Sequence, residues 1–505
     1  MTSSCLEPKD SQRGVHSLSR RESRRTFQKE KGRPMSEQRR SSCVQRKGMR
    51  LGLMSWLCLS VVGCGGVSEP EVAGPEQSSS ASAMQVERVR DSAELAKMRD
   101  YVDSLYDAKS VVHRFTSKGG DGIDCVPLYA QPALRQPGME NHRIQLAPGT
   151  EPVLPPERLA PSPTAPSEKW RAQPAALEGL ETAPDDLDAT GALRRCPVGS
   201  VPIVRLTLDT LKRFESLEDF RQKVPGHLRG NVSVETDKLR SLASATPSAR
   251  SGPTDLHQYA HTAQGVSNWG AEAIFNIWSP YTELSSEFSL SQMWVVRGSG
   301  SNLETVEAGW QKYRDLYGDD RARLFIYFTP DNYGSGGCYN LSCGAFVQVN
   351  NTVSIGGGFN NYSVTNGAQY EFKLMWFKDG TTGAWWLKFQ DIWVGYYPRT
   401  RFDAAGLMDR ADVIDFGGEI IDNRNGNLHT STDMGGGAYP GVGWANAAYT
   451  RNLLYVDTTN VYREPTSLGA WRNDSNCYDI IQYNNPGGWG RYFYFGGPGY
   501  NANCM

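Results

Sequence analysis

Residues 288–294 read Phe-Ser-Leu-Ser-Gln-Met-Trp, and this stretch decides the fold class. Every second residue from Phe288 to Trp294 falls on one face of a segment with a period of two, which is the period of a β-strand. Residues 370–376 repeat the pattern, with apolar or aromatic side chains on one face and Glu and Lys on the other. Both segments therefore predict strands that bury one face in a core.

Strand-like segments of this kind fill the C-terminal half, where Gly, Asn and Asp turns separate them. Eleven of the 13 tryptophans lie beyond residue 254. The further candidates are 323–329, 345–355, 385–396, 413–421, 452–457, 477–483 and 491–495. Many short strands over about 250 residues predict an all-β fold, an antiparallel β-sandwich of two large, jelly-roll-like sheets.

Composition and charge narrow the function classes. The chain has 505 residues, with 39% hydrophobic and 21% charged, which excludes a polytopic membrane protein. The net charge is −2, but residues 1–50 hold 14 Lys and Arg against 5 Asp and Glu, so the remainder is acidic. An acidic body behind a basic leader argues against a nucleic-acid partner.

The N-terminal region reads as an export signal. The apolar run 51–64 is too short to span a bilayer, which takes about 20 apolar residues, and it predicts a signal peptide over 49–64. The run ends Val-Val-Gly-Cys64, similar to a bacterial lipobox in which Cys64 is lipidated; an ordinary cleaved signal is the alternative. Residues 1–48 are expected to be an over-extended or disordered leader. We expect an exported protein, either an outer-membrane lipoprotein precursor or a form secreted after maturation.

The six cysteines beyond Cys64 suit disulfides in an oxidising compartment, because their number is even and no pair has metal-site spacing. Fifteen connectivities are possible. Proximity in the sequence favours the pairs Cys338–Cys343 and Cys477–Cys504, which leaves Cys125–Cys196.

The segment before the strand-rich region is divided by composition. We expect a helix over about 86–110, and we expect the Pro-rich stretch 150–193 to be disordered. The proposed boundaries are a flexible tether over 65–83, a compact region over 84–225, an exposed linker over 226–254 and the strand-rich domain over 255–505. The linker carries basic residues in flexible chain, where proteolytic nicking concentrates.

Most catalytic chemistries lack their residues here. There is no HExxH, no GxSxG and no phosphate-binding loop, and paired cysteines leave no free thiol. His257 and His261 have no acidic ligand sequence beside them. We therefore expect neither a metal nor a cofactor.

Two glutamates remain as candidates. Glu307 lies in Glu-Ala-Gly-Trp-Gln, and Glu419 lies in Asp-Phe-Gly-Gly-Glu-Ile-Ile. Apolar surroundings raise the pKa of a carboxylate, so two such groups facing each other would share one proton and act as a general base and a general acid. The alternative is a solvated or structural glutamate at each position.

Several motifs resemble those of one protease family. They are Glu307-Ala-Gly-Trp-Gln, Leu316-Tyr-Gly-Asp, Gly337-Cys-Tyr-Asn-Leu-Ser-Cys343, Gly417-Gly-Glu419, His429-Thr-Ser-Thr-Asp-Met-Gly435 and Tyr494-Phe-Gly-Gly-Pro-Gly499. Over 255–505 the chain resembles the neprosin family of glutamic prolyl endopeptidases. Upstream, Gly122-Ile-Asp-Cys-Val-Pro127 and Cys196-Pro-Val-Gly-Ser-Val-Pro202 resemble the family's activation peptide.

The resemblance implies a zymogen with catalytic residues Glu307 and Glu419, whose own pro-segment blocks the cleft. It also implies cleavage of peptide or protein substrates after proline at acid pH. Gln292 is a candidate donor to the developing oxyanion or a structural amide, Trp310 a proline-pocket or core residue, and His429 a site or loop-capping residue. The alternatives are an inactive or carbohydrate-binding β-sandwich and a glycoside hydrolase with paired carboxylates.

Overall fold

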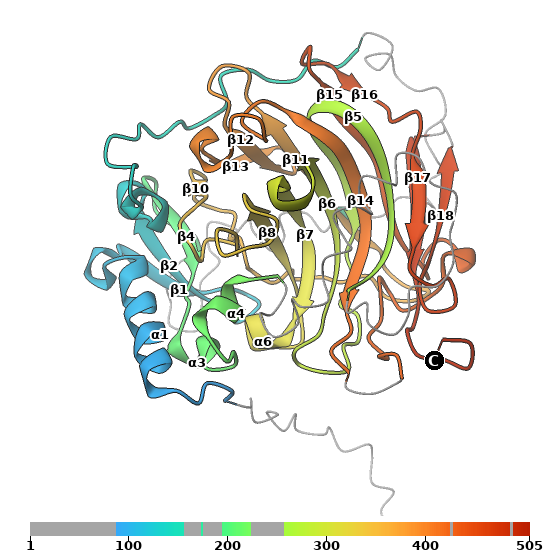
Figure 1. Ribbon diagram of the computed structural model, residues 1–505, viewed down its shortest axis with the longest axis horizontal. Coiled ribbons are helices and arrows are strands. Elements are labelled where there is room, and N and C mark those ends of the chain that lie inside the picture. Colours follow the sequence, from blue (N-terminus) through green and yellow to red (C-terminus); the bar gives the residue numbers. More distant parts are fainter. Residues whose placement is uncertain are drawn as a thin grey trace, which may run out of the picture. The chain divides into compact units, whose positions relative to one another are not determined.

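The computed structural model describes residues 87–155, 173–174, 194–223, 257–424, 428–484 and 488–504 (Figure 1). The expected leader, signal peptide, lipidation site, tether and cleavable linker lie outside the described residues, as does most of the 150–193 insertion. Within the described ranges, no helix has both the length and the apolar composition needed to cross a membrane.

The N-terminal region builds a small antiparallel sheet with short helices around it. Its strands are β1 (His113–Thr116), β2 (Gly122–Pro127) and β4 (Ser200–Val204), in the order β1-β2-β4. The helices are α1 (Ser92–Leu105), α3 (Leu208–Leu211) and α4 (Leu217–Arg221), with 3-10 turns η1 (Ala108–Ser110), η2 (Leu128–Ala130) and η3 (Pro132–Arg135). The predicted helix is therefore present with narrower bounds. It starts where the Asp91 side chain accepts a hydrogen bond from the Ala93 amide.

The rest of the chain forms one large sheet of sixteen strands among the described residues, antiparallel except for the short β3. The predicted all-β, antiparallel fold is confirmed. Its longer strands are β5 (His257–Asn276), β6 (Phe288–Arg297), β7 (Glu304–Tyr313), β8 (Ala322–Thr329), β11 (Tyr370–Lys378), β12 (Trp385–Phe389), β13 (Ile392–Tyr397), β14 (Ala411–Ile421), β15 (Ala448–Asp457), β18 (Asp479–Asn484) and β19 (Arg491–Gly496). The shorter elements are β3 (Gln173–Pro174), β9 (Cys338–Tyr339), β10 (Val347–Gln348), β16 (Tyr462–Arg463), β17 (Gly469–Arg472), α6 (Arg314–Tyr317), η7 (Gly300–Asn302), η8 (Arg399–Arg401) and η9 (Pro440–Val442).

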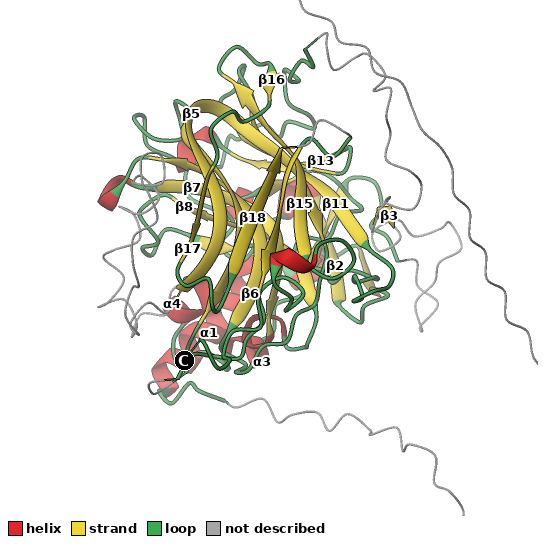
Figure 2. Cartoon of the chain, turned by 90° about the vertical axis from the view of Figure 1, so that its right-hand side faces the viewer, coloured by secondary structure: helices red, strands yellow, loops and turns green. Residues whose placement is uncertain are grey.

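Strand β5 joins the two halves of this sheet, which curls into a half-barrel (Figure 2). The first part of β5 pairs with β14 and β17, and its second part pairs with β11 and β15. Gly270 lies where the pairing partners of β5 change. Its φ is +133°, and a Cβ there would lie 1.9 Å from the Trp376 carbonyl oxygen. Only glycine allows β11 to approach this closely.

The two faces of β7 have different surroundings, and this difference positions the candidate site. Val306, Ala308 and Trp310 point into the main core, where they join apolar residues of β11, β12 and β19. The opposite face, which carries Glu307, lies on the side of a second apolar cluster that includes Phe214 and Phe220 of the N-terminal region. The region before the sheet therefore covers the glutamate face.

The structure differs from the predicted strands in three places. In 345–355 only Val347 and Gln348 form a strand, because the Asn350 side chain accepts hydrogen bonds from the backbone of Thr352 and Val353 and closes a turn. Segment 385–396 is a hairpin of two strands, β12 and β13, with Gln390 at φ +54° in its turn. Thirdly, strands β5 and β7 and the short β9, β16 and β17 were not among the predicted strands.

Candidate active site

The two glutamates lie on strands that flank β6. In the ladder, Glu307 of β7 is opposite Trp294 of β6, and Glu419 of β14 is opposite Leu290. Both side chains are buried, with 0% and 1% relative exposure. The fold thus brings together two residues that lie far apart in the sequence.

One ammonium group bridges the two carboxylates. Lys223 Nζ lies 2.8 Å from Glu307 Oε2 and 2.7 Å from Glu419 Oε2. The two oxygens are therefore within about 5.5 Å of each other. Lys223 comes from the N-terminal region, just after α4, and is itself buried. It occupies the space that a water molecule between the two carboxylates would need.

The glycines of the two glutamate motifs make room for neighbouring polar side chains. A Cβ on Gly309 would lie 2.8 Å from the Gln292 Cβ, and a Cβ on Gly417 would lie 2.3 Å from the His261 Cβ. Real Cβ atoms do not approach so closely, so each glycine keeps two strands together beside a bulky neighbour. The motifs Glu-Ala-Gly and Gly-Gly-Glu therefore have a packing reason as well as a chemical one.

Hydroxyl groups surround Glu307. Thr305 Oγ1 and the Tyr333 hydroxyl each donate to Glu307 Oε1, both at 2.8 Å. Asn332 and Tyr333 have φ of +56° and +58°, a left-handed conformation that costs free energy for residues other than glycine. This turn directs the Tyr333 side chain back to the glutamate.

Glu419 has a different set of partners. His257 Nδ1 lies 2.6 Å from Glu419 Oε1, the Tyr259 hydroxyl donates to the same oxygen at 3.3 Å, and Gln292 Nε2 donates to Oε2 at 3.2 Å. Burial alone would raise the pKa of Glu419, but the charges of Lys223 and His257 outweigh it and hold that pKa below its ordinary value. The expected raised pKa is therefore wrong for Glu419 with Lys223 in place, because the apolar flanks gave no sign of two cations.

The same balance acts on the lysine. Burial would lower the pKa of Lys223, but Glu307 and Glu419 outweigh burial and hold it above its ordinary value. Its ammonium also lies 5.4 Å from the centre of the Trp294 ring, at cation–π distance. The three charged groups stabilise one another in a place where none of them could be buried alone.

Contacts away from the glutamates also hold the N-terminal region on the sheet. Asp121 forms an ion pair with Arg323 at 2.6 Å, and both side chains are nearly buried. Arg213 donates to the Asp315 carbonyl at 2.8 Å. The Phe214 ring meets the Tyr313 ring edge-on at 6.2 Å. Lys223 is therefore the end of an extended interface.

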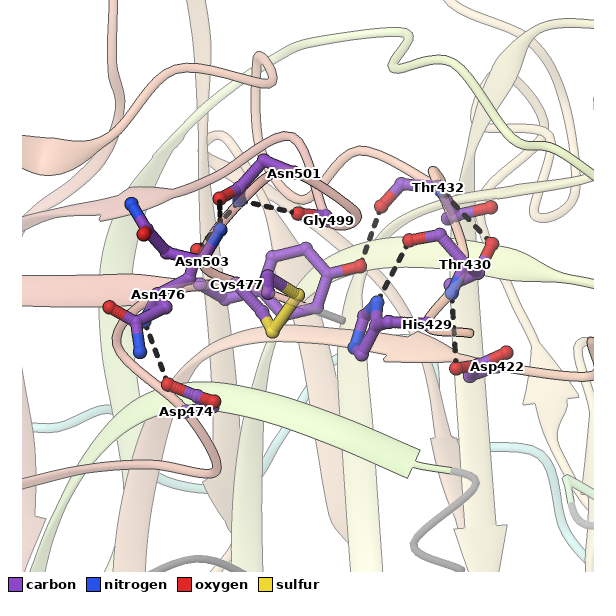
Figure 3. The surroundings of a disulfide bond; sticks show 12 residues. Asp422, His429, Thr430, Thr432, Asp474, Asn476, Cys477, Gly499, Asn501 and Asn503 are labelled. Carbon is purple, nitrogen blue, oxygen red and sulfur yellow. Dashed lines mark hydrogen bonds between the residues drawn. A yellow bond between two sulfur atoms is a disulfide. The ribbon is translucent and has the colours of Figure 1, made fainter. Parts of the chain in front are cut away.

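Of the other candidate residues, the structure brings only Gln292 to the glutamates. Trp310 lies on the other face of β7, is fully buried, and donates from Nε1 to the Asn276 carbonyl at 2.8 Å, so it is a core residue. His429 lies beside the Cys477–Cys504 disulfide, and its Nδ1 lies 2.8 Å from the Thr430 carbonyl (Figure 3). The positions of Trp310 and His429 therefore do not support a role at the substrate site for either residue.

All six cysteines beyond the signal region are paired. The disulfides are Cys125–Cys196, Cys338–Cys343 and Cys477–Cys504. His429, Cys477 and Cys504 bring possible ligand atoms within 4.8 Å of one another. Because the two sulfurs are bonded to each other, they do not provide thiolate ligands for a metal.

Sequence reasoning missed several residues around the glutamates. His257, Tyr259 and His261 alternate along β5, and this His-x-Tyr-x-His spacing was a usable sign of three rings on one face of a strand. Lys223 had no local sign, since its partners lie 84 and 196 positions further along the chain. Tyr333 depends on an unusual turn that the sequence does not announce.

A curled antiparallel sheet with two bridged glutamates beneath an N-terminal cover fits the precursor of a carboxylate-pair hydrolase. The family model for Neprosin matches residues 285–498, and that for the Neprosin activation peptide matches residues 114–262. The chain is therefore similar to the Neprosin family over most of the large sheet and to the Neprosin activation peptide over the region before it, which is called the activation peptide below. The second match ends at residue 262, inside β5 and five residues after His257, so the boundary of the match does not coincide with the boundary of the sheet.

Solved structures give a weaker likeness. Scytalido-glutamic peptidase with a transition-state analogue inhibitor is 10% identical, with a TM-score of 0.27 over 48% of this chain and 98% of that one. SCP-B, a member of the eqolisin family of peptidases, is also 10% identical, with a TM-score of 0.24 over 48% and 98%. A homodimeric agglutinin from chicken liver, CG-16, is 10% identical, with a TM-score of 0.18 over 32% and 93%. Scores this low say nothing about the activity of this chain.

Proposed function

We propose that the chain is the zymogen of a glutamic endopeptidase, with Glu307 and Glu419 as its catalytic residues. One observation carries the proposal: a buried lysine of the activation peptide lies between two buried glutamates, within 2.8 Å of both. A structural ion pair needs one carboxylate for each ammonium. Two carboxylates that both face the position of the Lys223 ammonium suit a site where another group, such as a water molecule, can replace the lysine.

The proposed chemistry needs no covalent intermediate. After Lys223 has left, a water molecule occupies its place between the carboxylates. The ionised carboxylate takes a proton from this water as the water oxygen bonds to the scissile carbonyl carbon, and the π electrons of the carbonyl move to its oxygen. The protonated carboxyl donates a hydrogen bond to that oxygen and then gives its proton to the amide nitrogen, so that the C=O bond reforms as the carbon–nitrogen bond breaks and the amine leaves. One carboxyl must be protonated, so we expect activity at acid pH.

The activation peptide is the proposed inhibitor. Lys223 offsets one of the two negative charges of the pair and fills the water position, and the surrounding apolar contacts exclude solvent. The cut that activates the enzyme must leave β5 intact, because β5 pairs with β11, β14, β15 and β17. We therefore propose that maturation occurs between Lys223 and His257.

The central test measures cleavage of a proline-containing peptide by the matured protein at several pH values. Glu307→Gln and Glu419→Gln should each lower turnover by about 10²–10⁴-fold or more, since each removes a proton-transfer group, while the fold stays intact by circular dichroism. Glu371→Gln is the matched control, because Glu371 is a buried glutamate of β11 paired with Arg451. Turnover that survives either catalytic substitution, or that a chelator abolishes, would overturn the proposal.

Cleavage after proline is a further part of the proposal, supported by the family resemblance and by aromatic rings beside the pair. The centroid of the Tyr259 ring lies 6.5 Å from that of Trp294 and 6.1 Å from that of Trp471. A flat pyrrolidine ring can stack on such faces. Mass-spectrometric mapping of cleavage sites in a peptide library tests it, and cuts without enrichment of proline on the acyl side would refute it.

We also propose that the protein is exported, with Cys64 as a lipid anchor, and that cutting the linker releases the protease from it. The order of segments supports this: signal, tether, activation peptide, linker and sheet. Mass spectrometry of secreted protein is the test. Released active protein that still begins at Cys64 would exclude release by this route.

A further inference from the structure

His257 is held against Glu419 from several sides. Its Nδ1 lies 2.6 Å from Glu419 Oε1, and only 6% of the residue is exposed. The Tyr259 ring stacks beside the imidazole with centroids 6.2 Å apart, and the Phe288 ring meets it at 5.8 Å. His257 is the first residue of β5, and the Ile421 position of β14 lies opposite it. The imidazole therefore has a fixed place at one of the two carboxylates and not at the other.

The charges around the two glutamates determine how the contact between His257 and Glu419 affects their protonation. In the precursor, two carboxylates face one ammonium, so an imidazolium at His257 brings the buried group to neutrality. After Lys223 has left, two carboxylates remain with His257, and neutrality then requires one added proton. Uncompensated buried charge is costly, so the added proton goes to the carboxylate without a cation. That carboxylate is Glu307, whose other partners are the hydroxyls of Thr305 and Tyr333.

We propose that His257 is a positioning residue that keeps Glu419 ionised in the matured enzyme, so that Glu419 is the general base and Glu307 the general acid. This inference rests on the proposed glutamic peptidase function and assigns the two roles within it. The proposed role of His257 also gives a second reason for the maturation cut to lie before the start of β5. A cut beyond His257 would remove the cation that distinguishes the two glutamates.

Tyr339 and Tyr397 lie close enough for the charges of Glu419 and Glu307 to act on them, and the titratable groups that bond to the pair within the described residues come from five segments. They are Lys223 of the activation peptide, Tyr259 of β5, Glu307 of β7, Tyr333 of the turn after β8 and Glu419 of β14. Only Lys223 and His257 among these can be cationic, and Lys223 leaves with the activation peptide. The tyrosine hydroxyls stay neutral donors at acid pH.

A second histidine on the same strand provides a matched control. His261 Nδ1 lies 2.7 Å from Asp415 Oδ2, and both side chains are buried. The pair has the same chemistry as His257 and Glu419, but among the described residues Asp415 forms no ion pair or side-chain hydrogen bond with Glu307 or Lys223. Substitution there disturbs a buried histidine–carboxylate pair without removing the cation from Glu419.

The test compares His257→Asn with His261→Asn in the matured enzyme. Asparagine keeps an N–H near the Nδ1 position and removes the charge. We expect the acid limb of the kcat/KM profile of His257→Asn to move up by about one pH unit, because the pKa of Glu419 rises. KM should change little, and His261→Asn should leave the acid limb unchanged. Coincidence of the His257→Asn and wild-type acid limbs, or an equal shift in both variants, would overturn the proposal.

An infrared measurement keeps the inference testable if His257→Asn does not fold. At its working pH, the matured wild-type enzyme should show a C=O stretching band from protonated Glu307, in addition to bands from other buried carboxyls such as Asp433, whose pKa burial raises to about 6. The band should be lost in Glu307→Gln and kept in Glu419→Gln, and the opposite result would overturn the assignment. If instead both glutamine variants retain full turnover, the proposed function fails, which is a different outcome from a failure of the His257 assignment.

Discussion

The activation peptide and the sheet each place a basic side chain against Glu419, and a cut between the two side chains separates only the first of them from the sheet. Lys223 is attached to the activation peptide and approaches Glu419 Oε2, while His257 begins β5 and approaches Glu419 Oε1. Residues 224–256 separate them, so a cut in that segment removes one cation and leaves the other. Glu307 receives the lysine alone. Loss of Lys223 would therefore leave Glu419 with a basic partner and Glu307 without one.

Substituting Lys223 should have the largest effect on this comparison. Lys223→Gln leaves two buried carboxylates without their shared cation, which should cost the precursor about 3–5 kcal/mol. The activation peptide should then detach at a higher pH and the linker should be cut faster. Thermal unfolding and the rate of maturation at fixed pH measure both effects.

Lys212→Gln is the control for that experiment. Lys212 is also in the activation peptide, but within the described part of the chain its ion-pair partner is the exposed Asp209, at 3.7 Å. Exposed pairs of this kind contribute about 0–1 kcal/mol. A Lys223→Gln precursor that is as stable and as latent as Lys212→Gln would show that the bridge does not maintain latency.

Acidification should weaken the same bridge in the wild-type precursor. The pKa of Glu419 is held below its ordinary value of 4.5, so its contribution to stability is present above pH 4.5 and is lost as pH falls through the lowered pKa. The pKa of Lys223 is held above 10.5, so its contribution is present below pH 10.5 and is lost as pH rises beyond that. The precursor should therefore be most stable between these limits.

Release of the activation peptide should take up protons at the acid end, because the pair loses the Lys223 ammonium and the proposed replacement for its charge is a proton on Glu307. Precursor melting temperature and activation-peptide binding, each measured against pH, check the prediction. In Glu419→Gln the fall in stability below pH 4.5 should be shallower than in wild type. An equally steep fall would attribute the acid sensitivity to other carboxylates.

The sequence predicted the fold class because alternation is a local property. The face that runs from Phe288 through Leu290 to Trp294 is confirmed, since these residues share one buried cluster. Strand β5 escaped prediction, because its register shifts against β14 and β15 and a positive-φ glycine interrupts its alternation. A strand that passes between two halves of a sheet does not keep one buried face throughout its length.

The site was predictable only as far as its motifs. Glu307 and Glu419 stand in recognisable segments, and the structure brings their carboxylates to one ammonium, while their catalytic roles stay a prediction. The surrounding residues could not be inferred in the same way. His257 lies 162 positions from Glu419, and their contact depends on strand pairing that no local pattern encodes. The charged partners of the two glutamates could therefore be identified only from the structure.

Two tryptophans on opposite faces of the sheet, Trp310 in the core and Trp294 at the site, should show the smallest effects. Trp310 is fully buried and donates to the Asn276 carbonyl, so Trp310→Phe should lower stability by about 1–2 kcal/mol through the lost hydrogen bond and packing, with KM unchanged. Trp294 lies beside Lys223 and near Tyr259, so Trp294→Phe should raise KM for a proline-containing peptide several-fold at little cost in stability. Chemical denaturation and steady-state kinetics of both variants separate the effects. A raised KM for Trp310→Phe with normal stability would return Trp310 to the substrate pocket, because only a residue on the glutamate face can contact a bound peptide without being part of the core.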